Sequence, residues 1–203
     1  MAKRTVAGTA KKNAESDGVI VFADETGFMM NPGIKKTWAP AGKTPVIVYR
    51  NRHHRKVSVL GALACQPGRN SIEVVCDFHP DAYVRAPQAA AFVHRLLAEY
   101  PGRRIDLIWD NLSARRSVLV KELPGDHANL HLHYLPPYAP DLNPSEMLWC
   151  LSKHHRLANH AIDNVPQLHT EARRVIDEVA AAAPLLRSCF AHAGLALWNA
   201  SAQ

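Results

Sequence analysis

The chain has 203 residues, of which 47% are hydrophobic and 21% are charged, a composition typical of one globular domain. It excludes an intrinsically disordered chain, and no internal repeat is visible. No uninterrupted apolar run reaches the roughly 18 residues that a membrane-spanning helix needs. The basic start, Met1–Lys12, lacks the apolar segment of a signal peptide. We therefore expect a cytoplasmic protein that does not contact a membrane.

The positive charge is concentrated in the N-terminal part of the chain. The net charge is +6, but residues 1–56 hold 11 basic and 4 acidic side chains, whereas residues 57–203 hold 13 and 14. A segment of one sign is suited to following a phosphate backbone, although a solvated basic hairpin has the same charge pattern. The candidate DNA contacts in this segment are Lys35, Lys36, Lys43, Arg50, Arg52, Arg55 and Lys56.

The first half of the chain is typical of an antiparallel sheet. Residues 1–17 are polar and basic and predict a flexible tail. Gly18–Asp24 is a short apolar run, typical of a strand buried on both faces. Turn residues dominate Gly27–Thr44, which we expect to be an excursion between strands. The runs predicted to form a meander with the first strand are Pro45–Arg50, Lys56–Ala64 and Ser71–Phe78.

The second half alternates helical and strand patterns. The pattern predicts a helix over Pro87–Tyr100, because apolar residues recur on one face before Pro101 and Gly102 end it. The further predicted elements are a strand over Arg104–Asp110, a helix over Ser113–Leu123, a strand over Asn129–Leu135, and helices over Asn143–Ala158, Val165–Ala183 and Leu185 to about Leu197. This order predicts a mixed α/β sheet with helices on its faces.

Three carboxylates occupy the positions where such sheets collect functional groups. Asp24 and Asp110 end predicted strands, and Glu146 begins a helix whose cap is Asn143. Taken singly, the aspartates are explained as turn residues and Glu146 as part of a capping box. Taken together at one sheet edge, they would repel one another unless a cation neutralised them. Ligands that are all oxygen atoms favour Mg²⁺ or Mn²⁺.

Four stretches carry a resemblance to a known family. They are Phe22–Phe28 (F-A-D-E-T-G-F), Thr37–Gly42 (T-W-A-P-A-G), Trp109–Asn111 (W-D-N) and Leu135–Trp149 (L-P-P-Y-A-P-D-L-N-P-S-E-M-L-W). The chain resembles DDE transposases of the bacterial insertion-sequence branch of the Tc/mariner superfamily, from about Gly18 to the C-terminus. The last stretch is the most specific, and the 35 residues between Asp110 and Glu146 are a spacing that this superfamily shows.

The resemblance implies a fold, an activity and a site. The implied fold is ribonuclease-H-like, a mixed five-stranded sheet flanked by helices. Asp24, Asp110 and Glu146 would be both catalytic residues and ligands of two Mg²⁺ or Mn²⁺ ions, with Asn111 in a supporting role. The implied activity is metal-dependent cleavage of DNA at transposon ends and joining to target DNA, within a synaptic complex of two copies.

The resemblance also sets an expected domain organisation. Residues 18–203 correspond to the catalytic domain, and the 17 residues before them leave no room for the helix-turn-helix that reads transposon ends. We therefore expect a separate helix-turn-helix polypeptide as a partner, and a bacterial, nucleoid-associated protein. On the Glu146 helix, Lys153 and Arg156 are further candidate phosphate contacts, with a solvated face as the alternative. Trp38 and Trp149 are predicted to be packing residues.

Two other functions agree with parts of the sequence. The first is a catalytically inert transposase remnant that binds DNA or pairs with an active copy, which the expected lack of a recognition region favours. The second is another ribonuclease-H-like nuclease that acts on RNA or on junctions. It would share the three acids but would leave the stretch from Tyr138 to Glu146 unexplained.

Overall fold

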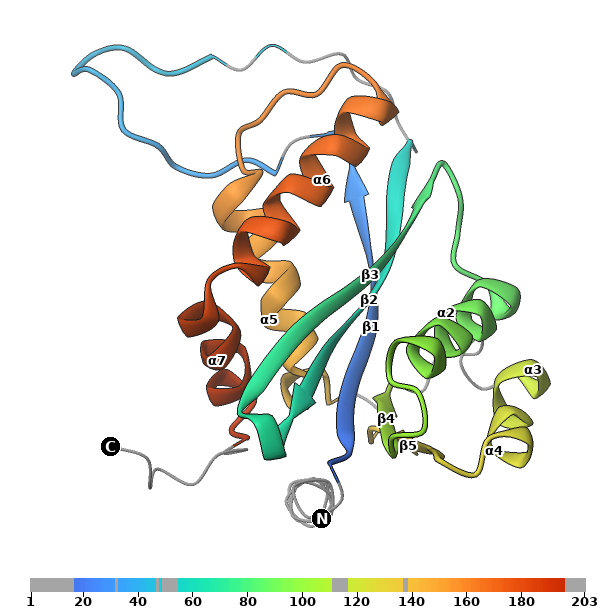
Figure 1. The fold of residues 1–203 in the computed structure, drawn as a ribbon. Coiled ribbons are helices and arrows are strands. Elements are labelled where there is room, and N and C mark those ends of the chain that lie inside the picture. Colours follow the sequence, from blue (N-terminus) through green and yellow to red (C-terminus); the bar gives the residue numbers. More distant parts are fainter. Residues whose placement is uncertain are drawn as a thin grey trace, which may run out of the picture.

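The computed structural model describes residues 17–31, 33–46, 48, 55–110, 117–136 and 139–195. At its centre lies a five-stranded sheet of order β3-β2-β1-β4-β5 (Figure 1). The strands are β1 (Val19–Met29), β2 (Lys56–Gln66), β3 (Ser71–Pro80), β4 (Ile105–Trp109) and β5 (Leu130–Tyr134). The first three strands pair antiparallel, whereas β4 pairs parallel with both β1 and β5. The predicted mixed five-stranded sheet is confirmed.

Helices cover both faces of this sheet (Figure 1). One face carries α2 (Ala86–Glu99), α3 (Val118–Lys121) and α4 (Leu123–Asp126). The other carries α5 (Pro144–Cys150), the π-helical segment η3 (Leu151–Arg156), α6 (Val165–Ala180) and α7 (Ala183–His192). Short 3-10 turns, η1 (Pro67–Arg69) and η2 (Pro140–Leu142), precede β3 and α5. Across the described ranges, none of the helices has the length and apolar character that crossing a bilayer would require.

The sheet separates two apolar clusters, because successive side chains of a strand point to opposite faces. Val21 and Leu107 pack with Phe92 of α2 on one side. On the other side Phe22 packs under α7, with its ring centroid 5.6 Å from that of Phe190 in an edge-to-face arrangement. The predicted helix over Val165–Ala183 is found as α6, and one apolar stripe of it is buried: Leu168, Ala172, Val175, Ile176 and Val179. This second cluster holds α5 and η3 against β1.

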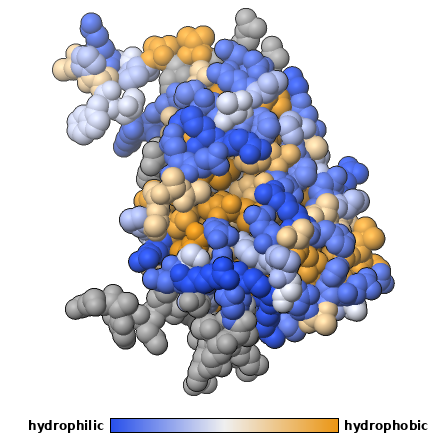
Figure 2. Space-filling model, in the orientation of Figure 1, coloured by the Kyte–Doolittle hydropathy of each residue, from blue (hydrophilic) through white to orange (hydrophobic). Residues whose placement is uncertain are grey.

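The molecular surface is mostly hydrophilic on the face shown in Figure 2, with hydrophobic residues gathered in places between the polar regions. One such place is α3, at the right of Figures 1 and 2, where Val118 and Leu119 are exposed. At the upper left an arm formed by residues 33–46 extends from the body, and every residue in it is exposed (Figure 1). This arm includes most of the predicted excursion over Gly27–Thr44, although Gly27–Met29 belong to β1.

The structure corrects four of the predicted elements. β1 is longer than predicted and runs to Met29, because it pairs with β2 over every position from Ile20 onward. No strand is found at residues 45, 46 and 48, and the rest of the predicted Pro45–Arg50 strand lies outside the described residues. Of the predicted helix over Ser113–Leu123, the structure describes residues 117–123, which hold α3 and the first residue of α4 in place of one continuous helix. The predicted helix over Asn143–Ala158 changes to π-helix at Leu151.

Candidate functional site

Three side-chain hydrogen bonds fix α5 along β1. Ser145 Oγ donates to the carbonyl of Phe22 at 2.6 Å, and Asn143 Nδ2 donates to the carbonyl of Ala23 at 3.0 Å. One turn further, Trp149 Nε1 donates to Asp24 Oδ2 at 3.0 Å. The first turn of α5 thus contacts Phe22 and Ala23, while Lys153, beyond α5, lies near Phe28 further along β1. This alignment brings the first turn of α5, with Glu146, to the level of Asp24.

Asn143 starts α5 and also ties the helix to the sheet. Its Oδ1 accepts from the Ser145 backbone N–H at 3.1 Å, which is an N-cap contact, while its amide nitrogen reaches the carbonyl of Ala23. Pro144 follows at the first helical position, where the missing N–H has no cost. The predicted start of this helix is therefore confirmed. Only 4% of Asn143 is exposed, so both contacts are buried.

We expect Asn143→Ala to be more damaging than the loss of an ordinary helix cap. The variant loses the cap and leaves the buried Ala23 carbonyl without that partner, so the free energy of unfolding should fall by about 2–3 kcal/mol. Asn164→Ala is the matched control, because Asn164 caps α6 through a 2.8 Å bond from Gln167 N at an exposed site. It should cost about 1 kcal/mol. Urea denaturation measures both values, and equal losses would contradict the second role of Asn143.

Asp24 lies at the point where β1 separates from β4. It was predicted to end its strand, but β1 continues past it, and Asp24 pairs opposite Gly61 of β2. The pairing with β4 stops earlier, at Phe22 opposite Ile108. Asp110 comes directly after the last residue of β4, so extending the parallel register by two residues places it beside Asp24. Asp24 therefore lies within β1, and Asp110 follows directly after the end of the neighbouring strand β4.

Lys153 connects Asp24 and Glu146 electrostatically. Burial lowers the pKa of Lys153, and the negative charges of Glu146 and Asp24 act in the opposite direction. Lys153 lies seven residues after Glu146, within η3. Its Nζ also lies 5.6 Å from the centroid of the Phe28 ring. The site thus combines a buried aspartate, an exposed glutamate and a partly buried lysine.

The structure does not bring the three acids to a common point. Among the residues that the structure describes, no three His, Cys, Asp or Glu side chains stand close enough together to hold a metal ion. Asp24 is 6% exposed and hydrogen-bonded, whereas Asp110 is half-buried and Glu146 is exposed. The donor set itself, carboxylate oxygens without thiol or imidazole, is of the kind that Mg²⁺ and Mn²⁺ prefer.

Gly61 provides the space for the ring that holds Asp24. A Cβ atom at this position would lie 2.5 Å from Cη2 of Trp149 and 2.8 Å from Sγ of Cys76. A side chain here would therefore displace the indole that donates to Asp24. The prediction that Trp149 packs in the core is confirmed, because only 3% of it is exposed. Sequence reasoning missed its bond to Asp24 and the role of Gly61, since neither contact leaves a local pattern.

The predicted basic residues fall into two groups. Lys35, Lys36 and Lys43 lie on the exposed arm, whose base is held by Asn159. Asn159 Oδ1 accepts from Lys35 N at 2.8 Å, and its Nδ2 donates to the carbonyl of Lys35 at 2.9 Å. The second group already has partners within the chain: Arg55 pairs with Asp81, and Lys56 Nζ lies 3.9 Å from the centroid of the Tyr83 ring.

Some predicted site residues fall outside the described part of the chain. They are Arg50, Arg52, Asn111 and the side chain of Arg156. Trp38 is described, and its prediction as a packing residue is wrong, because it is fully exposed on the arm. The arm lies away from the apolar clusters of the body, so Trp38 has no core to enter.

A family profile and several solved structures resemble this chain. The profile described as DDE superfamily endonuclease matches residues 19–169. A pre-cleavage Mos1 transpososome is 19% identical, with a TM-score of 0.60 over 96% of this chain and 61% of that chain. A Mos1 transposase paired-end complex with the left transposon end is 19% identical, with a TM-score of 0.59 over 95% and 60%. The catalytic domain of Mos1 mariner transposase is 14% identical, with a TM-score of 0.53 over 96% and 91%.

The profile covers well over half of the chain, which therefore belongs to the DDE superfamily endonuclease family. Its sheet flanked by helices matches the ribonuclease-H-like fold of the Mos1 transposase catalytic domain. The chain spans about three fifths of the length of the Mos1 chains in the two complexes. No curated protein matches it significantly.

Proposed function

We propose that this chain is the catalytic part of a transposase, which cleaves and joins DNA phosphodiesters with Asp24, Asp110 and Glu146. One observation carries the proposal: Asp24 is hydrogen-bonded to the helix that presents Glu146 and lies on the strand beside the end of β4, which Asp110 follows. Membership of the DDE endonuclease family and the similarity to Mos1 transposase support it. The sequence stretches that include W-D-N and Y-A-P-D-L-N-P-S-E favour the bacterial insertion-sequence branch.

Divalent cations are the cofactors that this donor set suits. Mos1 paired-end complexes have been solved with Mn and with Mg. We infer that Asp24, Asp110 and Glu146 hold Mg²⁺ or Mn²⁺ here, in a pair. When bound, such ions activate the attacking hydroxyl and neutralise charge that develops on the phosphate. Glu146 and Asp110 must turn toward Asp24 to share a centre with it, and the exposure of Glu146 leaves that movement open.

The residues around the acids have separate tasks in this proposal. Trp149 holds the Asp24 carboxylate through Oδ2, and the proposal assigns the other carboxylate oxygen to the reaction centre. Lys153 places a positive charge beside Asp24 and Glu146, where it can contact the scissile phosphate. The attacking group is first water and then the freed 3′-hydroxyl of the DNA, so no covalent protein intermediate is needed. Asn111 would support the Asp110 end of the site.

DNA would follow the basic residues from the arm to η3. The arm contributes Lys35, Lys36 and Lys43, and the site contributes Lys153 and Arg156. Arg55 and Lys56 would extend the same path, and Arg50 and Arg52, outside the described residues, remain candidates from the sequence. In a synaptic complex two copies of the chain would hold the two transposon ends. The protein would act in the bacterial nucleoid.

The basic path predicts a steep dependence of DNA binding on salt. With about six phosphate contacts, the affinity for duplex DNA should fall about 10³-fold between 50 and 200 mM salt. Replacing Lys35, Lys36 and Lys43 together with Gln should make the slope of the log–log plot shallower by about 2.7. Lys121→Gln on α3, exposed on the other face of the sheet, should leave the slope unchanged. Fluorescence anisotropy measures these slopes, and a nearly flat dependence in the unaltered chain would contradict the path.

The effect of Asp110→Asn on plasmid nicking distinguishes an active enzyme from an inert remnant. In the enzyme, Asp110→Asn removes metal-dependent nicking of supercoiled plasmid while DNA binding remains. In a remnant, the unaltered chain already binds DNA without nicking it, and the variant changes nothing. The plasmid assay with Mg²⁺ or Mn²⁺, run beside a binding assay, therefore decides between the two functions.

A further inference from the structure

Asn159, in the loop after η3, makes three hydrogen bonds to the base of the exposed arm. Its Oδ1 accepts from Lys35 N at 2.8 Å, and its Nδ2 donates to the carbonyl of Lys35 at 2.9 Å. Its own backbone N–H donates to the carbonyl of Gly33 at 2.9 Å. The amide of Asn159 thus pairs with both polar backbone groups of Lys35, as a neighbouring strand would. Bonds to two arm residues fix the direction of the chain at this point as well as its position.

The loop that carries Asn159 is anchored in the apolar core on both sides. Leu157 is 8% exposed and Ile162 is 4% exposed, and both belong to the cluster that contains the stripe of α6. The backbone of Asn159 has a φ of 62°, a left-handed conformation that asparagine adopts more readily than most residues other than glycine. The loop follows η3, which continues α5. The arm is therefore tied to the helical segment that carries Glu146 and Lys153.

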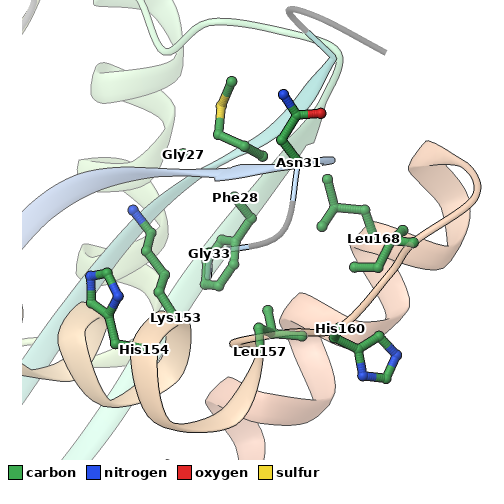
Figure 3. Close-up of a pocket in the computed structure, with 11 residues that line it drawn as sticks. Gly27, Phe28, Asn31, Gly33, Lys153, His154, Leu157, His160 and Leu168 are labelled. Carbon is green, nitrogen blue, oxygen red and sulfur yellow. The ribbon is translucent and has the colours of Figure 1, made fainter. Parts of the chain in front are cut away.

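The base of the arm and the segment after η3 also line one cavity of about 270 Å³ beside η3 (Figure 3). Gly33 contributes from the arm, Phe28 from β1, and Leu157 and His160 from the segment that follows η3. The arm thus leaves the sheet next to this segment. The bonds of Asn159 lie at that point of departure.

Burial does not hold the arm against the body of the molecule. Every residue from 33 to 46 is exposed, including the apolar Trp38. At the sheet, Met30 N donates to the carbonyl of Arg55 at 3.3 Å, which closes the excursion where it leaves β1 and returns to β2. The bonds of Asn159 lie beyond this closure, on the arm itself. They are therefore placed to set the direction in which the arm extends.

The direction of the arm decides where three positive charges lie. Lys35, Lys36 and Lys43 are exposed, and residues 33–46 include no acidic side chain. Such charges strengthen DNA binding when they lie near phosphates. Ordering a loop during binding costs free energy, so a loop that already has its bound direction gives a higher affinity.

We propose that Asn159 is a positioning residue, which holds the arm in the direction in which Lys35, Lys36 and Lys43 meet the DNA that is bound at the acids. The proposal rests on the proposed function, because it takes the arm to bind DNA. Asn159 does not itself contact DNA in this proposal. It acts through the arm, and its effect on DNA affinity therefore depends on the three lysines.

The test measures how Asn159→Gly changes DNA affinity with and without the lysines. Glycine removes both side-chain bonds and retains the left-handed backbone conformation, which alanine would strain. Fluorescence anisotropy with a labelled duplex, at one salt concentration, gives the affinity in the unaltered chain and in the chain with Lys35, Lys36 and Lys43 replaced by Gln. We expect Asn159→Gly to weaken binding about fivefold or more in the first background and less than about twofold in the second. A general loss of structure would weaken binding equally in both.

Two further variants and one direct measurement separate the side chain from its surroundings. Asn70→Gly is the matched control, because Asn70 is exposed, has a φ of 50° and follows η1 at the end of β2 away from the arm. It should leave the affinity unchanged. Asn159→Asp keeps the acceptor for Lys35 N and loses the donor, so its effect should lie between those of Asn and Gly. Hydrogen exchange, followed by mass spectrometry, should become faster at Lys35 in Asn159→Gly and stay unchanged in α6.

The outcomes separate this proposal from the proposed function. If the unaltered chain binds no DNA at any salt concentration, the proposed function fails and the role of Asn159 fails with it. If the chain binds DNA but Asn159→Gly leaves the affinity unchanged, only the role of Asn159 is overturned. The same holds if Asn159→Gly weakens binding equally with and without the three lysines.

Discussion

Replacing Asp24 with Asn will remove metal-dependent nicking of DNA, with a loss of rate of at least about 10³-fold, and will leave DNA binding intact. In the proposed site, the carboxylate would provide several kcal/mol of charge stabilisation through a bound cation, and about 1.4 kcal/mol corresponds to each factor of ten. Asn retains an oxygen that can accept from Trp149 Nε1, so the folded structure should persist. Single-turnover nicking of plasmid measures the rate, and isothermal titration with Mn²⁺ should show weaker metal binding.

Glu25 offers the matched control for this experiment. It is the next residue of β1 and therefore points to the opposite face of the sheet. Glu25→Gln removes one negative charge at nearly the same place in the chain, yet nicking and metal binding should stay close to those of the unaltered protein. If the two variants lose activity equally, the loss reflects charge or stability in general, and Asp24 has no special role.

Gly61→Ala is the second change with a large expected effect. The added methyl group would lie 2.5 Å from the ring of Trp149, so the indole must move away from β2. Overpacking of this kind typically costs about 1–3 kcal/mol of unfolding free energy. The displaced indole would also lose its bond to Asp24, so nicking should slow by more than the loss of folded protein explains. Urea denaturation and plasmid nicking measure the two effects.

Gly27→Ala distinguishes this clash from a general effect of replacing glycine in the sheet. Gly27 lies in β1, and a Cβ there would meet only Lys56 Cδ at 3.6 Å, an ordinary contact. We expect a change in unfolding free energy within about 0.5 kcal/mol and normal nicking. A double-mutant cycle with Trp149→Phe should show coupling to Gly61→Ala, because a smaller ring relieves the clash. A fully stable Gly61→Ala protein would contradict the described packing.

The strands and most helices could be predicted because their signals are local. Apolar runs such as Gly18–Asp24 and the stripe of α6 identify elements that are buried on one or both faces. Asn143 and Pro144 mark the start of α5 in the same local way. The three acids could be chosen because each adjoins such a boundary in the sequence. The order of elements then gave the mixed sheet.

Features that depend on pairing partners could not be predicted. Asp24 was expected at a strand end, yet β1 continues because β2 is long enough to pair with it as far as Met29. Trp149 packs against Gly61 and donates a hydrogen bond to Asp24, and both contacts join residues that are far apart in the sequence. The cavity beside η3 could not be predicted either, because residues far apart in the sequence line it, among them Asn31, Lys153 and Leu168.

The most direct test of the catalytic assignment is nicking of supercoiled plasmid by the purified chain, with and without Mg²⁺ or Mn²⁺, beside Glu146→Gln. Glu146 is exposed on the first turn of α5, so this substitution should not disturb folding. We expect nicked plasmid only when both the metal and Glu146 are present, with unchanged DNA binding by the variant. Nicking that persists in Glu146→Gln or without metal would contradict a site built from these three carboxylates.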